Sequence, residues 1–341
     1  MGLLSCKSIF QKNNKFLYYS GNFLNQLFPR LIFRKRLGKK LKKLQNYDSS
    51  YVWSRVHYYN KLGANTEIGT NPVVLKNFKY GVKPKTYFFD SYDLFRFFPS
   101  SLKMNYLFGD VTHCPEQPSF VKSRPVGKRN ENSVVLKLNK IRHFMFVKDC
   151  TAFKHKRNLL VWRGKVYQNN RSAFLKRYFG HPLCDVGKVN NDWGNNEHLL
   201  KRMSINEHLK FKFILCLEGN DVASNLKWVM SSNSIAVMPK PKYETWFMEG
   251  TLIGGVHYIE IRDDFSDLEE KLNYYIENTH KSEEIIRNAH QHVEQFKDTH
   301  HEQIISLLTI LKYFHQTGQN VGDLNSYIAN NLASADNFGL S

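Results

Sequence analysis

The sequence has no hydrophobic run long enough to cross a membrane. None of its apolar stretches approaches the roughly 18 to 20 residues that a bilayer-spanning helix needs, so we expect no integral membrane protein. The N-terminal segment is interrupted by Lys7, Lys12 and Lys15 and has no small-residue cleavage site, so we expect no secretory signal. It also lacks the myristoylation pattern, because Cys6 occupies the position where that pattern needs serine or threonine.

Cysteine is scarce, and the usual catalytic motifs are missing. The five cysteines are widely spaced and form no CxxC pair, so we expect neither a disulfide framework nor a zinc knuckle, and we expect a reducing, cytosolic compartment. The sequence contains no HExxH motif and no Asp-x-Asp pair, which leaves metal chemistry with little support. P-loop, GxGxxG and GxSxG motifs are absent as well.

Acidic residues are few, and their distribution is uneven. The chain of 341 residues has 49 Lys and Arg against 30 Asp and Glu, a net charge of +19 that calls for an anionic partner. Residues 1–47 carry eleven basic groups and no acid, residues 48–255 carry +16, and residues 256–341 carry −8. A basic polyanion-binding or nucleic-acid-binding protein is therefore one functional class to test.

The basic arm, residues 1–47, interleaves cations with apolar residues at roughly helical spacing. This pattern is typical of an amphipathic helix lying on anionic lipid, and it equally fits a helix whose apolar stripe packs on the protein's own core. A nucleic-acid-binding arm is a third interpretation, although no recognisable nucleic-acid module follows it.

From residue 158 onward, short apolar runs alternate with helical patterns, which predicts a doubly wound parallel sheet. The expected strands are 159–162, 211–217, 234–238 and 257–261. The expected helices are 170–179, 204–210, 222–231, 243–249, 266–278, 282–296 and 300–315, with a capping box opening the helix at 266. A polar loop is expected at 186–196, and a less regular α/β region at about 50–150.

Loops follow three of these strands, at 162–165, 218–221 and 239–244, and the first and third of them carry cations. Ligands of parallel sheets bind at the carboxyl ends of strands, where helix N-termini attract phosphate. Arg163, Lys165, Arg171 and Lys227 would suit a diphosphate, with Glu244 and Glu249 available for ribose hydroxyls. The alternative is that these are ordinary exposed loops with surface cations.

Asp110 ends the apolar run 104–108 after Gly109 and precedes the segment Lys122-Ser123-Arg124. An acid at a strand end facing a phosphate site can act as a general base. An aspartate that simply ends a strand in a turn explains the same pattern.

The order of several short motifs resembles glycosyltransferase family 90. The motifs are FGDVT (108–112), KSRP (122–125), NSVVLKL (132–138), RHF (142–144), VWRG (161–164), LEGNDVASNLKW (217–228), YE (243–244) and HYI (257–259). The resemblance covers about residues 100–300 and is closest to the bacterial lipopolysaccharide branch of the family.

The resemblance implies a GT-B-like α/β fold, with two Rossmann-like domains facing a central cleft and C-terminal helices. It implies no metal and no cofactor. The implied division is the arm at 1–47, with possible membrane association, an acceptor-side domain at 48–155, a UDP-sugar-binding domain at 156–315 and a polar tail at 316–341.

The resemblance also implies inverting transfer of a hexose, glucose or galactose, from a UDP-sugar to a lipopolysaccharide core acceptor. The enzyme would be cytoplasmic and peripheral on the inner membrane, without a nucleic-acid partner. Asp110 falls on the catalytic base. The implied donor-binding residues are Lys122, Ser123, Arg124, Arg163, Gly164, Lys165, Arg171, Gly219, Val222, Ala223, Ser224, Asn225, Lys227 and Glu244. An inactive nucleotide-sugar-binding relative is a further alternative.

Overall fold

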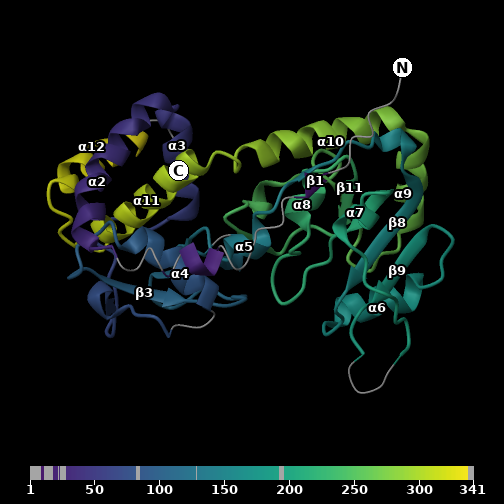
Figure 1. Cartoon of the computed structure of the whole chain (residues 1–341), viewed down its shortest axis with the longest axis horizontal. Helices are drawn as coiled ribbons and strands as arrows, with labels where there is room; N and C mark the ends of the chain where they lie inside the picture. Colours follow the sequence, from purple (N-terminus) through teal and green to yellow (C-terminus); the bar gives the residue numbers. More distant parts are fainter. Residues whose placement is uncertain are drawn as a thin grey trace. The chain divides into compact units, whose positions relative to one another are not determined.

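The computed structural model describes residues 9–10, 18–21, 23, 28–81, 85–127, 129–191 and 196–336. Contacts within the chain divide it into two compact units (Figure 1). The first unit comprises Asn14–Ile141, Tyr243–Phe247 and Phe296–Ser341. The second unit comprises Met1–Asn13, Arg142–Lys242 and Met248–Gln295. Both have a mixed α/β fold that contains parallel strands.

The first unit combines a four-stranded sheet with a group of helices. The sheet has the order β2 (Val73–Val74), β3 (Lys103–Leu107), β4 (Ser119–Val121) and β6 (Ser133–Val135). Strands β3, β4 and β6 are parallel, and β2 is antiparallel to β3. The helices are α2 (Arg30–Lys42), α3 (Ser49–Tyr59), α4 (Lys85–Phe95), α11 (Thr299–Gln316) and α12 (Leu324–Asp336).

Helix α11 is the central helix of the first unit and is buried along most of its length. Its amino end is capped by the Asp298 carboxylate, which accepts from the amides of His300 and His301. Further along, the Tyr313 ring lies 4.3 Å from the ring of Phe120 on β4. In Figure 1, the purple α2 and α3 lie beside α11 and α12, so helices from residues 30–59 and from residues 299–336 belong to the same unit.

The second unit is built around a five-stranded sheet in the order β13-β11-β10-β8-β9, in which all strands are parallel. The strands are β8 (Arg157–Gly164), β9 (Cys184–Lys188), β10 (Phe211–Leu215), β11 (Ile235–Met238) and β13 (Ile259–Glu260). The helices are α6 (Asn169–Tyr178), α7 (Ile205–His208), α8 (Leu226–Met230), α9 (Leu268–Glu277) and α10 (Thr279–Glu294). The prediction of a doubly wound parallel sheet is confirmed.

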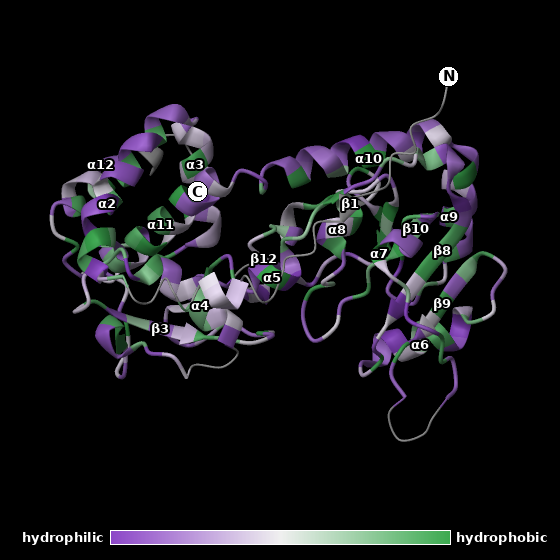
Figure 2. Ribbon diagram, in the orientation of Figure 1, coloured by the Kyte–Doolittle hydropathy of each residue, from purple (hydrophilic) through white to green (hydrophobic). Residues whose placement is uncertain are grey.

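Alternate strand residues of this sheet form one hydrophobic core. Trp162, Leu215 and Val237 belong to it, together with Phe174 of α6 and Leu272 of α9. The central strands β10 and β11 are buried along their whole length, as expected for parallel strands whose two faces are both covered. Helix α10 shows alternating green and purple patches in Figure 2, as its amphipathic sequence predicts.

The chain reverses its direction across this sheet between β8 and β10. From β8 it continues through α6 to β9 on one side, and it then returns to β10 on the other side of β8. Such a topological switch point leaves a crevice at the carboxyl ends of the two strands, where open α/β sheets bind their ligands.

The expected helix at 243–249 is wrong. Residues Tyr243–Thr245 form strand β12, which pairs antiparallel with β5 (Ser123–Pro125), and a 3-10 turn follows at Glu249–Thr251. Tyr243 and Thr245 suit an extended strand, and pairing with a distant strand outweighs a weak local helical preference.

Other expectations also differ from the structure. The chain passes between the units near α5 (Lys140–His143), and α11 belongs to the first unit, so the observed units do not follow the expected boundaries at 155 and 315. Helix α12 forms within the expected polar tail, where Ile328 is fully buried. Strand β9 extends into the loop expected at 186–196.

Two smaller expectations are wrong as well. The expected capping box at 266 does not form, because Asp267 is the N-cap of α9 and makes no side-chain capping bond. Strand β7 (Val147–Lys148) pairs with β1 (Ile9–Phe10). Cys150, two residues after β7, is disulfide-bonded, although no disulfide framework was expected. Cys114, Cys184 and Cys216 are free thiols.

Candidate active site

Asp110 lies at the carboxyl edge of the parallel sheet of the first unit and pairs with Lys122. Leu107 at the end of β3 is in register with Val121 at the end of β4, so the residues that follow both strands meet at this edge. The Lys122 ammonium lies 2.7 Å from the Asp110 carboxylate. The Lys122 side chain is 3% exposed and that of Asp110 is 42% exposed, so solvent reaches the carboxylate rather than the ammonium.

The turn that carries Asp110 is held by its neighbours. Gly109 has φ of +136°, a backbone conformation that favours glycine. The Ser123 hydroxyl accepts from the Val111 amide at 3.2 Å and bonds the Val111 carbonyl oxygen at 3.3 Å. Ser123 is fully buried and thereby fixes the backbone that directly follows Asp110. In this structure Ser123 therefore holds the turn that carries Asp110.

Arg124 and Glu244 form a buried pair between β5 and β12. Arg124 donates to the Glu244 carboxylate at 2.6 Å and to the Tyr58 carbonyl oxygen at 2.7 Å, and the Tyr58 hydroxyl also donates to Glu244. Arg124 is 0% exposed and Glu244 is 2% exposed. The expectation that Glu244 binds a ribose hydroxyl is therefore not supported, because this buried carboxylate already serves Arg124 and Tyr58.

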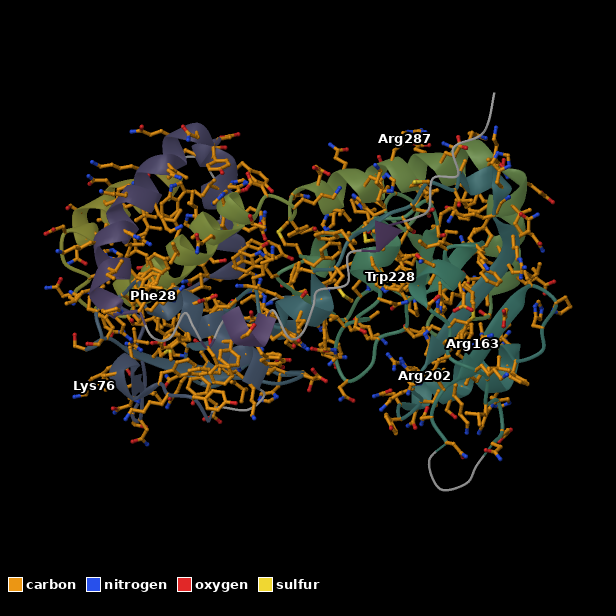
Figure 3. All side chains as sticks on the ribbon, in the orientation of Figure 1. Phe28, Lys76, Arg163, Arg202, Trp228 and Arg287 are labelled. Carbon is orange, nitrogen blue, oxygen red and sulfur yellow. The ribbon has the colours of Figure 1, made fainter. Side chains whose placement is uncertain are left out.

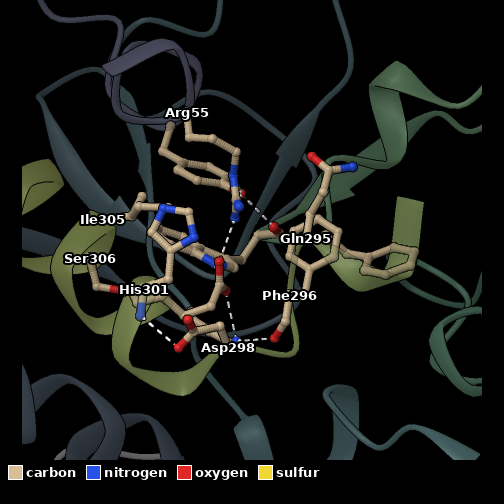
Figure 4. Close-up of polar contacts among 12 residues, drawn as sticks. Arg55, Gln295, Phe296, Asp298, His301, Ile305 and Ser306 are labelled. Carbon is tan, nitrogen blue, oxygen red and sulfur yellow. Dashed lines mark hydrogen bonds and ion pairs between the residues drawn. The ribbon is translucent and has the colours of Figure 1, made fainter. Parts of the chain in front are cut away.

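A second buried charge cluster lies beside this strand pair (Figure 4). Arg55 and Lys137 lie 2.8 Å and 2.7 Å from the two carboxylate oxygens of Glu302, and the Trp246 indole N–H donates to Glu302 at 2.6 Å. Burial alone would raise the pKa of Glu302, but the charges of Lys137 and Arg55 outweigh it and lower the pKa below its ordinary value. The cluster anchors segment 243–247 to α3 and α11.

In the second unit, the loops after β8, β10 and β11 are tied together at the switch point. The Gln168 amide donates to the Asn220 side chain at 2.7 Å, and Asn170 donates to the Glu218 carbonyl oxygen at 3.2 Å. The backbone amide of Lys242 donates to the Glu218 carboxylate at 3.0 Å. The three loops that the sequence placed at one crevice therefore do meet.

Arg171, in the first turn of α6, spans the switch point. Its guanidinium donates to the carbonyl oxygens of Lys165, Leu217 and Glu218 at 2.9, 2.9 and 3.2 Å. Burial lowers the pKa of Arg171 from its ordinary value, but an arginine remains charged at neutral pH. Within the described part of the chain, no carboxylate pairs with this cation.

Two glycines allow the backbone to pack closely around Arg171 and Trp162. A Cβ on Gly219 would lie 3.0 Å from a terminal nitrogen of Arg171, so a side chain there would displace the guanidinium. A Cβ on Gly164 would lie 2.2 Å from the indole of Trp162, over which Arg171 lies at 5.7 Å. Both positions thus require a close approach that only glycine permits without displacing a neighbour.

Arg163 and Lys227 are paired with acids of their own unit. Arg163, labelled in Figure 3, lies 2.5 Å from the Asp185 carboxylate and donates to the Lys201 carbonyl oxygen. Lys227 is fully buried, and its ammonium lies 2.6 Å from Glu249. Both therefore differ from the expected open phosphate ligands, and Glu249 is not available for a ribose hydroxyl.

The segment 222–225 is not a helix N-terminus. Helix α8 begins only at Leu226 and has five residues, with Asn225 as the N-cap. Val222 and Ala223 are buried, Ser224 is exposed, and the Asn225 side chain donates to the Leu215 carbonyl oxygen at 2.9 Å. The expected helix start at residue 222 is therefore wrong, and α6 is the helix that begins at the switch point.

Comparisons with known proteins agree with this arrangement. The sequence profile of glycosyl transferase family 90 matches residues 136–309, about half of the chain. The chain is also 45% identical over 263 residues to O-glucosyltransferase LpsA of Dichelobacter nodosus, across 77% of this chain and 82% of that protein. The chain belongs to glycosyl transferase family 90. It is a glycosyltransferase.

Some site residues of this family 90 glycosyltransferase were not singled out from its sequence. Gln168 and Asn170 bridge two loops, and amides at the start of the helix that follows β8 were an available signal for them. Tyr58 contacts Glu244 from α3, and no local pattern marks it. Within the described residues, no cluster of three His, Cys, Asp or Glu side chains is arranged to hold a metal ion, and no helix is long and apolar enough to span a bilayer.

Proposed function

We propose that this enzyme transfers a hexose from a UDP-sugar to a lipopolysaccharide core acceptor, with inversion and without a metal ion or cofactor. Glucose is favoured over galactose, because the relative with 45% identity is an O-glucosyltransferase. The order of motifs that resembles the bacterial lipopolysaccharide branch supports the acceptor class. The proposal includes a GT-B arrangement of the two units and a cytoplasmic enzyme that works at the inner membrane surface.

The single observation that carries the proposal is the environment of Arg171. A partly buried guanidinium without a carboxylate partner, at the switch point of a parallel sheet, favours an anion there. Gly219 lets the loop after β10 approach this guanidinium closely. A diphosphate is the anion that suits this position, because the N-terminus of α6 adds backbone N–H donors to the same edge.

During transfer, negative charge develops on the departing UDP. Arg171 would stabilise this charge together with Lys165, whose side chain is exposed on the adjacent loop. Arg163 and Lys227 are left out of this role because each already pairs with an acid. Preorganised donors of this kind typically lower the barrier by about 3 to 4 kcal/mol each.

Asp110 would take the proton from the acceptor hydroxyl as that oxygen attacks the anomeric carbon. The bond from this carbon to the UDP oxygen breaks on the opposite face, through an oxocarbenium-like transition state. The partly exposed carboxylate of Asp110 supports this role, and the buried Lys122 would hold its orientation.

The substitution Asp110→Asn tests the proposal. We expect the variant to lose transfer from UDP-glucose or UDP-galactose to purified lipooligosaccharide by at least about 100-fold, because general-base catalysis typically contributes this much. Its affinity for UDP, measured by calorimetry, should remain that of the wild type. The exposed Asp323 provides a matched control, since Asp323→Asn should retain full activity.

Other results would favour the alternatives. Transfer at the wild-type rate in Asp110→Asn would remove this residue from the mechanism. Binding of UDP-sugars without product on any acceptor would favour an inactive relative. A UDP concentration of 100 times Kd stabilises a protein by about 2.7 kcal/mol, so absence of a thermal shift with uridine nucleotides, together with a shift on single-stranded nucleic acid, would favour the polyanion-binding alternative.

A further inference from the structure

Helix α2 (Arg30–Lys42) has one buried face and one exposed face. Phe33, Leu37 and Leu41 recur every fourth residue and are 9%, 3% and 3% exposed. The Phe33 ring lies 5.4 Å from the ring of Phe97, so this stripe packs on the first unit's own core. Of the three interpretations of the basic arm, packing on the protein's own core is the one that holds for this face.

The opposite face presents apolar side chains to solvent. Leu31 is 63% exposed and Ile32 is 39% exposed, and Phe28, which lies two residues before the helix and is labelled in Figure 3, is 54% exposed. Surface positions with such residues are common singly, but three within five positions form a local apolar patch. The packed core does not account for this patch.

Exposed lysines continue the same face toward the end of the helix. Lys35, Lys39 and Lys42 follow Leu31 at spacings of four, four and three residues, which places them on one side of an α-helix. Arg34, Arg36 and Lys43 flank them, and all six cations are exposed. In the part of the chain that the structure describes, none of the six forms an ion pair.

Two other cations of α2, in contrast, contact other parts of the first unit. Arg30 donates to the Leu75 carbonyl oxygen at 3.2 Å, and Lys40 donates to the Gln303 side chain at 2.5 Å. These two side chains serve the packing of α2 on the first unit. The six exposed cations do not contribute to this packing. The first acidic residue in the sequence is Asp48, so residues 1–47 contain no acid that could pair with them.

We infer that this outer face, Phe28, Leu31, Ile32, Lys35, Lys39 and Lys42, docks on an anionic phospholipid bilayer. The apolar residues would insert at the level of the headgroups while the lysines contact lipid phosphates. A nucleic acid would pair with the cations but would leave Leu31 and Ile32 in water. A second copy of this chain would bring the same positive charge against itself, which opposes self-association.

Lipid binding tests this inference without any sugar transfer, so its failure is distinct from failure of the proposed reaction. The full-length protein is sedimented with vesicles of phosphatidylcholine alone and with vesicles that contain phosphatidylglycerol. We expect binding only to the anionic vesicles, with a loss at high salt. Each lysine near such a surface contributes about 1 kcal/mol, so Lys35→Gln with Lys39→Gln and Lys42→Gln should weaken binding by about 100-fold.

A matched control separates this face from net charge. The variant Lys176→Gln with Lys210→Gln and Arg287→Gln removes three exposed cations of the second unit and should bind almost as the wild type does. The variant Leu31→Gln with Ile32→Gln keeps all charges and should weaken binding by about 10-fold through lost apolar insertion. Circular dichroism confirms that each variant is folded.

Several outcomes would overturn the inference. The inference is wrong if the wild type does not bind anionic vesicles, or if it binds neutral vesicles equally well. An equal loss in the control variant would assign binding to net charge. Vesicle affinity equal to that of the wild type in the Leu31→Gln, Ile32→Gln variant would exclude insertion of these side chains. Binding to single-stranded DNA in place of vesicles, lost in the lysine variant, would identify nucleic acid as the partner.

Discussion

Lys122 is buried, and its ammonium lies 2.7 Å from the partly exposed carboxylate of Asp110. The sequence had placed Lys122 among the donor-binding residues. The buried ammonium donates to this carboxylate, so the pairing fixes both side chains at the end of the parallel strands β3 and β4. Lys122 is thus a positioning residue for the proposed base.

Replacing Lys122 by methionine should lower kcat and leave the KM for the UDP-sugar nearly unchanged. Methionine fills a similar volume without leaving a buried charge, so the variant is expected to fold. We expect kcat to fall by about 10- to 100-fold, because misplacement of a catalytic group by about 1 Å has an effect of this size. Steady-state kinetics give both constants. Lys103→Met, at the exposed start of β3, is the control. A rise in KM at constant kcat would return Lys122 to the donor site.

Removing the Arg171 side chain should weaken UDP binding. Arg171→Ala loses a guanidinium that joins the loops after β8 and β10 and, in our proposal, contacts the diphosphate. A hydrogen bond to a charged group contributes about 1.5 to 3 kcal/mol, which corresponds to about 10- to 100-fold in Kd measured by calorimetry. Arg177→Ala changes an exposed arginine of the same helix and should not alter the Kd. Equal affinity in both variants would place UDP elsewhere.

Replacing Glu302 by glutamine should destabilise the first unit strongly. The change leaves Arg55 and Lys137 buried without their shared carboxylate, and breaking such a buried pair typically costs about 3 to 5 kcal/mol. Urea unfolding measures the difference. Glu284→Gln removes an ion pair with Lys281 in which both side chains are 50% exposed, and should change stability by less than about 1 kcal/mol. Similar values for both variants would contradict this account.

His208 should make the protein less stable in mild acid. Burial lowers the pKa of this ring from its ordinary value of 6.5, although a hydrogen bond to the Ser204 carbonyl oxygen opposes the shift. The unfolded chain therefore takes up this proton at higher pH than the folded one, and stability is lost as the pH falls through 6.5 toward the folded pKa. One such group contributes at most about 1.4 kcal/mol per pH unit.

Unfolding free energies at pH 7.5 and 5.5 check this prediction. His208→Phe removes the titrating group and keeps an aromatic ring beside Trp228, 5.8 Å from the wild-type ring. This variant should lose less stability between the two pH values than the wild type does. The exposed His280, changed to glutamine, should leave the wild-type difference intact. An identical pH dependence in His208→Phe would show that other groups are responsible.

Much of the second unit follows from local sequence. Continuous apolar runs such as that in β10 separated by amphipathic helices define a parallel sheet, and polar loops after those runs define its ligand edge. The position of Asp110 at the end of a strand also follows from its neighbours. Such features depend on residues within a few positions of one another, and a periodic pattern records them directly.

The partners of the charged residues were decided by tertiary structure. Arg124 and Glu244 are 120 positions apart, yet the pairing of β5 with β12 brings them to 2.6 Å. In the same way, Arg163 forms an ion pair with Asp185, and Lys227 forms one with Glu249. In the described part of the chain, Arg171 pairs with no carboxylate. The sequence by itself determined which strand ends carry cations. The fold determined which of those cations are already neutralised, because these ion pairs depend on tertiary contacts between distant segments that no local pattern encodes.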